Sequence, residues 1–216
     1  MTLFNEYDEN IYEGLYLTDI EGLAILEGGQ KGKKPTVVEP SFTHTFSTTG
    51  EHVVYAKLSR NREAFMYVSK LIEAIIPDGV TEIGNHAFFG CNNLTNVIIP
   101  NSCTYIANEV FFNCTSLIKI IIPESVRSIG YYTFSGCKSI SEITFPESIG
   151  YIDTYALTVM PNLHKITSLA MTAPKIIDDY GYGDMGRPSD YGTLYVPAGA
   201  IGYDKWMEVL GEGWTI

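Results

Sequence analysis

Cysteine is the residue type whose spacing most suggests chemistry in this chain. Cys91, Cys114 and Cys137 follow one another at equal intervals, and Cys103 stands outside that series. A zinc site needs converging ligands, commonly from Cys-x-x-Cys pairs, which the sequence lacks. A nucleophilic cysteine needs a nearby base such as histidine, and no histidine recurs beside this series. We therefore expect four reduced, buried thiols rather than a disulfide scaffold or a metal site.

The remaining candidates for chemistry are isolated. The four histidines stand at unrelated positions, and no metalloprotease, hydrolase or paired acid–base pattern accompanies them: His44, His52, His86 and His164. Gly181, Gly183 and Gly186 match the spacing of a dinucleotide-binding loop, but that site requires a preceding strand and a following helix, and Pro188 follows at once. The sequence predicts a protein that is not an enzyme and that has no catalytic residue, metal site or cofactor.

The stretch from 178 to 192, DDYGYGDMGRPSDYG, has the most unusual composition. Its tyrosines, Tyr180, Tyr182 and Tyr191, lie among glycines and aspartates, a composition that adaptable binding loops use. Several carboxylates could also hold a cation, although the EF-hand spacing is missing. A solvated connector is the favoured interpretation, and a loop that contacts a partner is the alternative.

An internal repeat explains the cysteine spacing. Four units of equal length align without gaps, at 75–97, 98–120, 121–143 and 144–166, and a degenerate half unit precedes them at 64–74. The same apolar columns return in each unit, for example Leu94, Leu117, Ile140 and Leu163. Such columns stack from one turn of the chain to the next into a continuous core. The sequence therefore predicts a solenoid, in which the cysteine column is a core position.

Each unit divides into two extended pieces and a corner. A Val/Ile-rich strand ends at Pro100, Pro123 or Pro146, because proline cannot donate a hydrogen bond to a neighbouring strand. A second short strand follows, as in VTEIG and VRSIG. The AFFGC segment then turns the corner, as a helical or 3₁₀ turn with its aromatic ring inside.

The outward residues of the first strand form a candidate contact face. If Val97 and Ile99 point inward, Asn96 and Ile98 point outward. The outward columns then contain the residues hypothesised to contact a protein partner: Ile75, Ile98 and Ile121 as an apolar ridge, with Asn96 and Lys119 beside it. A half-shielded β-branched ladder without a partner is the favoured interpretation, and the contact face is the alternative. Glu142 is expected to pair with both Lys119 and Lys165.

Composition limits the class of partner and the compartment. The net charge of −11 disfavours nucleic acid and anionic lipid, and 45% hydrophobic with 18% charged residues is typical of a folded chain. No run of about 20 apolar residues predicts a membrane helix. The start of the chain, from Met1 to Gly22, lacks the basic and apolar regions of a signal peptide, which leaves three alternatives open: retention inside a cell, export by another route, or a leader that has been removed.

The unit IPxSVxxIGxxAFxGCxxLxxI resembles the BspA-like leucine-rich repeat family of Bacteroides-type bacterial proteins. The best match contains Pro123, Val126, Ile129, Gly130, Phe134, Gly136, Cys137, Ile140 and Ile143. The resemblance implies a right-handed leucine-rich-repeat solenoid with short β-strands joined by turns. It also implies a protein at the cell surface or secreted, since some members are adhesins that bind host matrix proteins or other bacteria.

Both ends of the solenoid need caps, because a stacked core is otherwise exposed there. Residues 1–60 alternate apolar and polar positions and are expected to form a small all-β unit. Residues 61–170 would hold the repeats, and residues 171–216 would form a strand–helix cap in which Trp206 and Trp214 cover the last turn.

These observations lead to two hypotheses of function. The first is a non-catalytic protein-binding module of adhesin type, with an extracellular-matrix or other surface protein as its partner. The second is a structural or spacer component of a larger assembly, such as a virion, an appendage or a multidomain surface protein, which would place the chain in that assembly instead.

Overall fold

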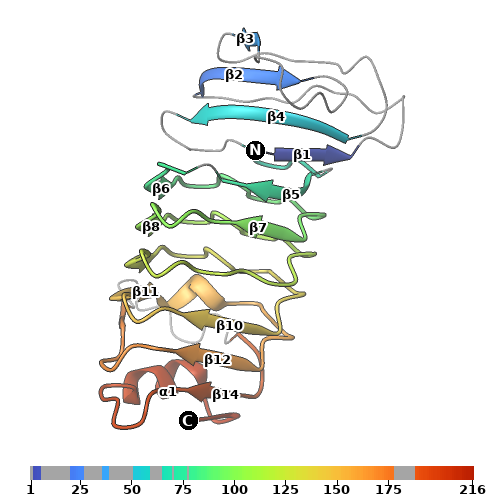
Figure 1. Ribbon diagram of the computed structural model, residues 1–216. Coiled ribbons are helices and arrows are strands. Elements are labelled where there is room, and N and C mark those ends of the chain that lie inside the picture. The colour runs from blue at the N-terminus through green and yellow to red at the C-terminus, as the bar shows by residue number, and fades with distance from the viewer. Residues whose placement is uncertain are drawn as a thin grey trace.

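The computed structural model describes residues 65–69, 71–76, 78–177 and 188–216, apart from the side chains of Thr154 and Ile177, together with the backbone of four N-terminal strands. Those four are β1 (Thr2–Asn5), β2 (Ile20–Leu26), β3 (Thr36–Val38) and β4 (Glu51–Leu58). The chain forms an elongated stack of similar turns, with these strands at one end and a helix at the other (Figure 1). The parallel-strand solenoid predicted from the repeat is confirmed.

The first strand of each repeat contributes to what we call the front face. Its strands are β5 (Leu71–Ile75), β7 (Asn96–Ile98), β10 (Glu142–Phe145), β12 (Lys165–Ser168) and β14 (Gly192–Tyr195). β5 pairs in parallel with β7, and β10, β12 and β14 pair in parallel with one another. Residues 119–121, in the rung between β7 and β10, belong to no strand.

The second strand of each repeat contributes to a side sheet. Its order is β13 (Lys175–Ile177), β11 (Tyr151–Asp153), β9 (Ser128–Ile129), β8 (Tyr105–Ile106) and β6 (Glu82–Ile83). Every adjacent pair is parallel; the pairs from β6 to β11 keep the register of the repeat, such as Ile83 with Ile106, and β11 pairs with β13 one residue further on, as Ile152 with Ile176. The side sheet therefore runs through all the rungs without a break.

Aromatic rings fill the corner between the side sheet and the next front strand. Phe65, Phe88, Phe111 and Phe134 lie in one column, with successive ring centroids 5.4, 5.5 and 5.7 Å apart and planes within 13° of parallel. The corner is a series of turns in most units, and becomes a 3₁₀ helix, η2 (Thr154–Leu157), in the last. The aromatic position was thus predicted correctly, and the helical form occurs only in that unit among the described residues.

One corner position requires a left-handed backbone in every rung. Gly90 and Gly136 have φ of 71° and 78°, and in the same column Tyr67, Asn113 and Val159 have φ of 59°, 56° and 54°. Glycine and asparagine tolerate this conformation, whereas a β-branched residue is strained in it. At Gly136, an added Cβ would also lie 2.1 Å from the Asn113 side-chain oxygen.

The N-terminal strands are all antiparallel to their partners and extend the front sheet. β1 lies between β4 and β5, so the start of the chain joins the N-terminal strands to the first rung. The pairing of β2 with both β3 and β4 completes this end. The strands lie in the region where the sequence predicts an all-β unit.

The C-terminal end is covered by α1 (Asp204–Leu210) and β15 (Trp214–Thr215). Trp206 is buried, lies edge-on to Phe145 with ring centroids 6.0 Å apart, and donates from Nε1 to the Pro174 carbonyl at 3.0 Å. Trp214 is buried beside Gly192, where a Cβ would come within 2.6 Å of the indole. Both tryptophans therefore cover the last turn, as predicted.

Candidate protein-contact face

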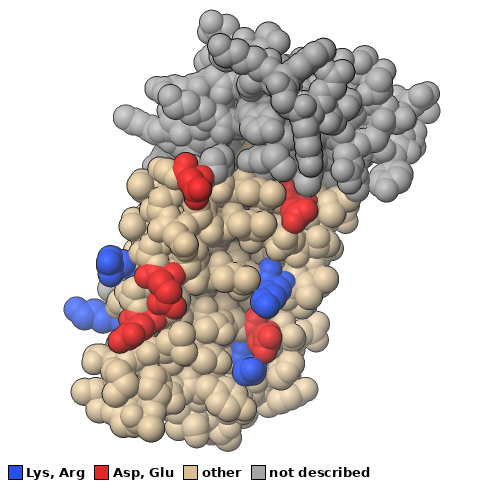
Figure 2. Space-filling model, viewed as in Figure 1, with Lys and Arg blue, Asp and Glu red and all other residues tan. Residues whose placement is uncertain are grey.

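The front face carries three parallel columns of outward side chains. The first, which we call the mixed-charge column, contains Glu73, Asn96, Lys119, Glu142 and Lys165. The second, the outer strip, contains Ile75, Ile98, Ile121, Thr144 and Thr167. The third follows the proline of each unit and is called the acidic column: Asp78, Asn101, Glu124 and Glu147. Figure 2 shows an uncharged strip between two sets of charged side chains on this face.

The outer strip exposes apolar surface in its central rungs. Ile98 and Ile121 are 47% and 67% exposed, whereas Ile75 is half-buried. Their inward neighbours Val97 and Ile120 are buried, because successive side chains of an extended chain point to opposite faces. The inward and outward assignment made from the sequence is correct for these residues.

Ile118 is another exposed isoleucine of the front face and was missed in the sequence. It is 63% exposed and occupies a column that holds Thr95, Ser141 and His164 in the neighbouring units. In the full units the other members of this column are polar, and the half unit has Ile72 there, so the alignment of the repeats already contains the signal. Ile98 and Ile121 make the central part of the outer strip apolar, whereas Ile118 lies on the other side of Lys119 from that strip.

At both ends of the mixed-charge column, neighbouring side chains of the column pair with each other. Asn96 donates to the Glu73 carboxylate at 2.6 Å, and Lys165 pairs with Glu142 at 3.2 Å and lies 5.7 Å from the centre of the Tyr195 ring. The expected pair between Glu142 and Lys119 is wrong: Lys119 forms no ion pair with any described residue. Strand pairing is absent between its rung and β10, so the register that would align the two side chains is not held.

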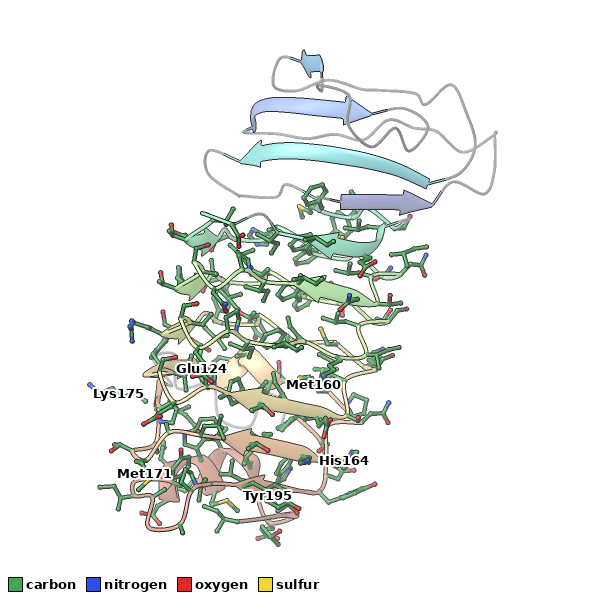
Figure 3. The ribbon with its side chains drawn as sticks, viewed as in Figure 1. Glu124, Met160, His164, Met171, Lys175 and Tyr195 are labelled. Atoms are coloured by element: carbon green, nitrogen blue, oxygen red, sulfur yellow. The ribbon has the colours of Figure 1, made fainter. Side chains whose placement is uncertain are left out.

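The acidic column contains no cation of its own. Asp78, Glu124 and Glu147 are exposed and form no ion pair within the part of the chain that the structure describes. Asn101 is the neutral member of the column. In Figure 3, Glu124 lies at the opposite side of the stack from His164, and Tyr195 lies near the C-terminal end. Lys175 lies on the side of Glu124 in the same view, so that side also carries basic side chains, farther from the outer strip than the acidic ones (Figures 2 and 3).

The tyrosines predicted as contacts do not join this face as a group. Tyr191 is 71% exposed and immediately precedes β14, two rungs beyond β10 in the direction of the C-terminus. It is thus separated from Ile121 by the rungs of β10 and β12. Tyr180 and Tyr182 lie outside the described residues, as does the glycine motif from Gly181 to Gly186.

The four cysteines are free and buried, as the repeat predicts. The thiols of Cys91, Cys114 and Cys137 donate to the carbonyls of Phe65, Phe88 and Phe111 in the preceding rung, at 3.0, 3.2 and 3.1 Å, respectively. Burial raises the pKa of the Cys91 thiol to about 12 and raises the pKa of Cys114 and Cys137 as well. A protonated, buried thiol is a poor nucleophile, so the column has the properties of core packing.

An acid–base group that the sequence analysis did not find lies at the corner. His86 Nε2 is 3.6 Å from Glu109 Oε1, which also accepts a hydrogen bond from the Tyr131 hydroxyl at 2.7 Å. The three residues come from successive rungs, so only the stacking brings them together. None of the cysteine thiols is available to this group, because the structure buries all four. No group of three His, Cys, Asp or Glu within the described residues could hold a metal ion.

Among the residues that the structure describes, no helix has the length and apolarity needed to span a bilayer.

Comparison with known proteins agrees with this architecture. The model of the BspA-type leucine-rich repeat region, in six copies, matches residues 59–180. A leucine-rich repeat protein of T. pallidum is similar in structure with a TM-score of 0.52 at 22% identity, over 71% of this chain and 76% of that one. A leucine-rich repeat protein of Bacteroides ovatus has a TM-score of 0.50 at 24% identity, over 81% of this chain and 46% of that one.

This chain thus matches less than half the length of the Bacteroides ovatus protein. No curated protein is significantly similar in sequence. The family model covers more than half of the chain, and its repeats coincide with the stacked rungs. The chain belongs to the BspA-type leucine-rich repeat family.

Proposed function

We propose that this protein is a non-catalytic binding module that contacts a protein partner through the front face, and that it acts as an adhesin-type protein at a bacterial surface or after secretion. The observation that carries the proposal is the exposure of Ile98 and Ile121, which occupy the same outward column in neighbouring rungs. A contiguous exposed apolar patch in a folded protein is characteristic of a contact site.

The architecture supports a macromolecular partner. A solenoid presents an extended surface that is assembled from equivalent positions of successive repeats. On the front face, the outward residues can differ from one repeat to the next without altering the core. The inward residues Val97, Ile120 and Ile143 are all buried, although their outward neighbours are of different types. The family implies a surface or secreted protein, which supports a host matrix protein as the partner.

The proposal is tested with the purified full chain and purified host extracellular-matrix proteins, by surface plasmon resonance. The test variant is the double substitution Ile98→Asp/Ile121→Asp, and the matched control is Ile201→Asp, an exposed isoleucine near the C-terminal cap. Urea unfolding of each variant shows whether folding is preserved. We expect at least one matrix protein to bind the wild type and Ile201→Asp, and to bind the double variant at least about tenfold more weakly.

Two results would overturn the proposal in different ways. Equal binding by the double variant would remove the front face from the contact. Failure of every matrix protein to bind would remove the adhesin assignment, and the assembly hypothesis would then be tested by binding to structural proteins of the source organism.

A further inference from the structure

The charge on the two sides of the outer strip is unequal. On one side, the acidic column places Asp78, Glu124 and Glu147 on the surface without an ion pair among the described residues. On the other side, Glu142 is neutralised by Lys165, and Glu73 accepts a hydrogen bond from Asn96. The unpaired carboxylates of the acidic column are therefore the charges nearest the strip on that side, and the Lys and Arg side chains of the same side lie farther from the strip (Figure 2).

The difference in charge across the outer strip is clearest in the rung of Ile121, the most exposed isoleucine of the strip. Lys119, Ile121 and Glu124 follow one another across the front face and are all exposed. The next rung repeats the acidic position with Glu147, and the Ser148 hydroxyl donates to the Val126 carbonyl at 2.8 Å, which joins the two rungs just beyond the two acidic residues. Unpaired carboxylates on adjoining rungs repel each other, and a cation placed against them removes that repulsion.

The arrangement is suited to side chains rather than to a metal ion. The carboxylates stand in a row along the stack and do not converge, and no metal-holding group of acidic residues exists among the described residues. Lysine and arginine side chains, which are spaced along a polypeptide, match a row of this kind. The apolar strip beside the row requires apolar side chains in the same partner.

We propose that the partner segment on the front face is amphipathic: apolar side chains cover Ile98 and Ile121, and lysine or arginine side chains lie along the acidic column at Glu124 and Glu147. The inference rests on the proposed function, since it assigns the chemistry of the partner to the same face. It also predicts the orientation of the partner segment. Lys119 repels basic groups of the partner on one side of the outer strip, and Glu124 attracts them on the other.

The test selects displayed random peptides on the immobilised full chain. The enriched peptides are then synthesised and measured by fluorescence anisotropy against the wild type, Glu124→Lys/Glu147→Lys and the control Glu208→Lys/Glu212→Lys. The control changes the net charge by the same amount at exposed positions near the C-terminus. We expect enriched peptides to combine aliphatic or aromatic residues with Lys or Arg, and to lose at least about tenfold in affinity only in the Glu124/Glu147 variant.

Rising salt is expected to weaken this binding in the wild type and in the control, because exposed charges are screened. Enriched peptides without basic residues, equal affinity for the Glu124/Glu147 variant, or no enrichment at all would each overturn the inference. Peptides that lose affinity for Ile98→Asp/Ile121→Asp but not for the Glu124/Glu147 variant would leave the proposed function standing and remove only the assigned chemistry.

Discussion

The side sheet and the front face of the solenoid are built from the same repeats but differ in continuity. In the side sheet, β6, β8, β9, β11 and β13 pair without interruption. On the front face, the pairing stops after β7 and resumes at β10. Among the described residues, the rung of residues 119–121 is joined to β7 on the front face by one long backbone hydrogen bond, which the Ile118 N–H donates to the Thr95 carbonyl at 3.5 Å.

The core does not follow this break. Ile120 and Ile122, in the interrupted rung, are as buried as Val97 and Ile99 in the rung before it. The outward residues of the same rung, Ile118 and Ile121, are the most exposed isoleucines of the front face. The comparison teaches that inward side-chain stacking holds the rungs together, while the outward positions of the front face are free to serve as a contact surface.

The largest effect is expected from removing an inward ring. Phe111 is fully buried between Phe88 and Phe134, so Phe111→Ala should lower the free energy of unfolding by about 3–5 kcal/mol. Its sequence neighbour Phe112 is half-buried, and Phe112→Ala should cost clearly less. Urea unfolding measures both, and equal losses would contradict the primary role of the inward stack.

The cysteine column should make the protein sensitive to alkali. Because the pKa of Cys91 rises from 9.0 to about 12 on folding, the folded state holds this proton when the unfolded state has lost it. The stabilisation is complete below about pH 9 and is lost as the pH rises toward 12, by about 1 kcal/mol at pH 10. Urea unfolding at several pH values should show a shallower decline in Cys91→Ala, and an unchanged slope would argue against the burial of this thiol.

A smaller, stabilising effect is expected where the corner carries an unsuitable residue. Val159 has φ of 54° and an exposed side chain, so Val159→Asn should relieve strain and raise the free energy of unfolding by about 1 kcal/mol. Gly136→Ala, in the equivalent position, should destabilise the protein, because φ is 78° there and the Asn113 side chain occupies the space. Thermal unfolding distinguishes the two, and a destabilised Val159→Asn variant would show that valine is not strained.

The smallest effect is expected at the interruption of strand pairing between β7 and β10. The Thr95 hydroxyl, at 3.0 Å, and the Thr95 N–H both donate to the Ile72 carbonyl in the preceding rung. Ile118, the equivalent residue of the interrupted rung, has no hydroxyl that could add such a bond. Ile118→Thr should therefore extend strand pairing across the interrupted rung and raise stability by about 0.5 kcal/mol. Amide hydrogen exchange at residues 118–121 would show the new protection, and unchanged exchange would mean that the side chain does not control the break.

The inward half of the structure could be predicted because burial repeats with the sequence. Each leucine or isoleucine of the column Leu94, Leu117, Ile140 and Leu163 is fully buried, and the phenylalanines of AFFGC-type segments stack as a column. The family resemblance is confirmed on the same basis. A constant repeat length places equivalent side chains of successive rungs in contact. The apolar type of these residues was therefore enough to predict that they are buried.

Other features depend on geometry that the repeat length does not specify. The break at residues 119–121 arises in backbone hydrogen bonds, although its sequence, KII, is rich in β-branched residues. The contact of His86 with Glu109 and Tyr131 depends on how far each side chain reaches across a rung. The acidic column, in contrast, can be predicted from the aligned units, because Asp78, Asn101, Glu124 and Glu147 each follow the proline of their unit.

The separation of core from contact surface is tested most directly by two alanine substitutions at adjacent positions, compared by urea unfolding. Ile120 is 5% exposed and Ile121 is 67% exposed, in the rung where front-face pairing is interrupted. The account predicts that Ile120→Ala loses about 2–4 kcal/mol of stability and that Ile121→Ala loses less than about 0.5 kcal/mol. Comparable losses for the two variants would contradict it, because Ile121 would then belong to the core and not to a surface available for binding.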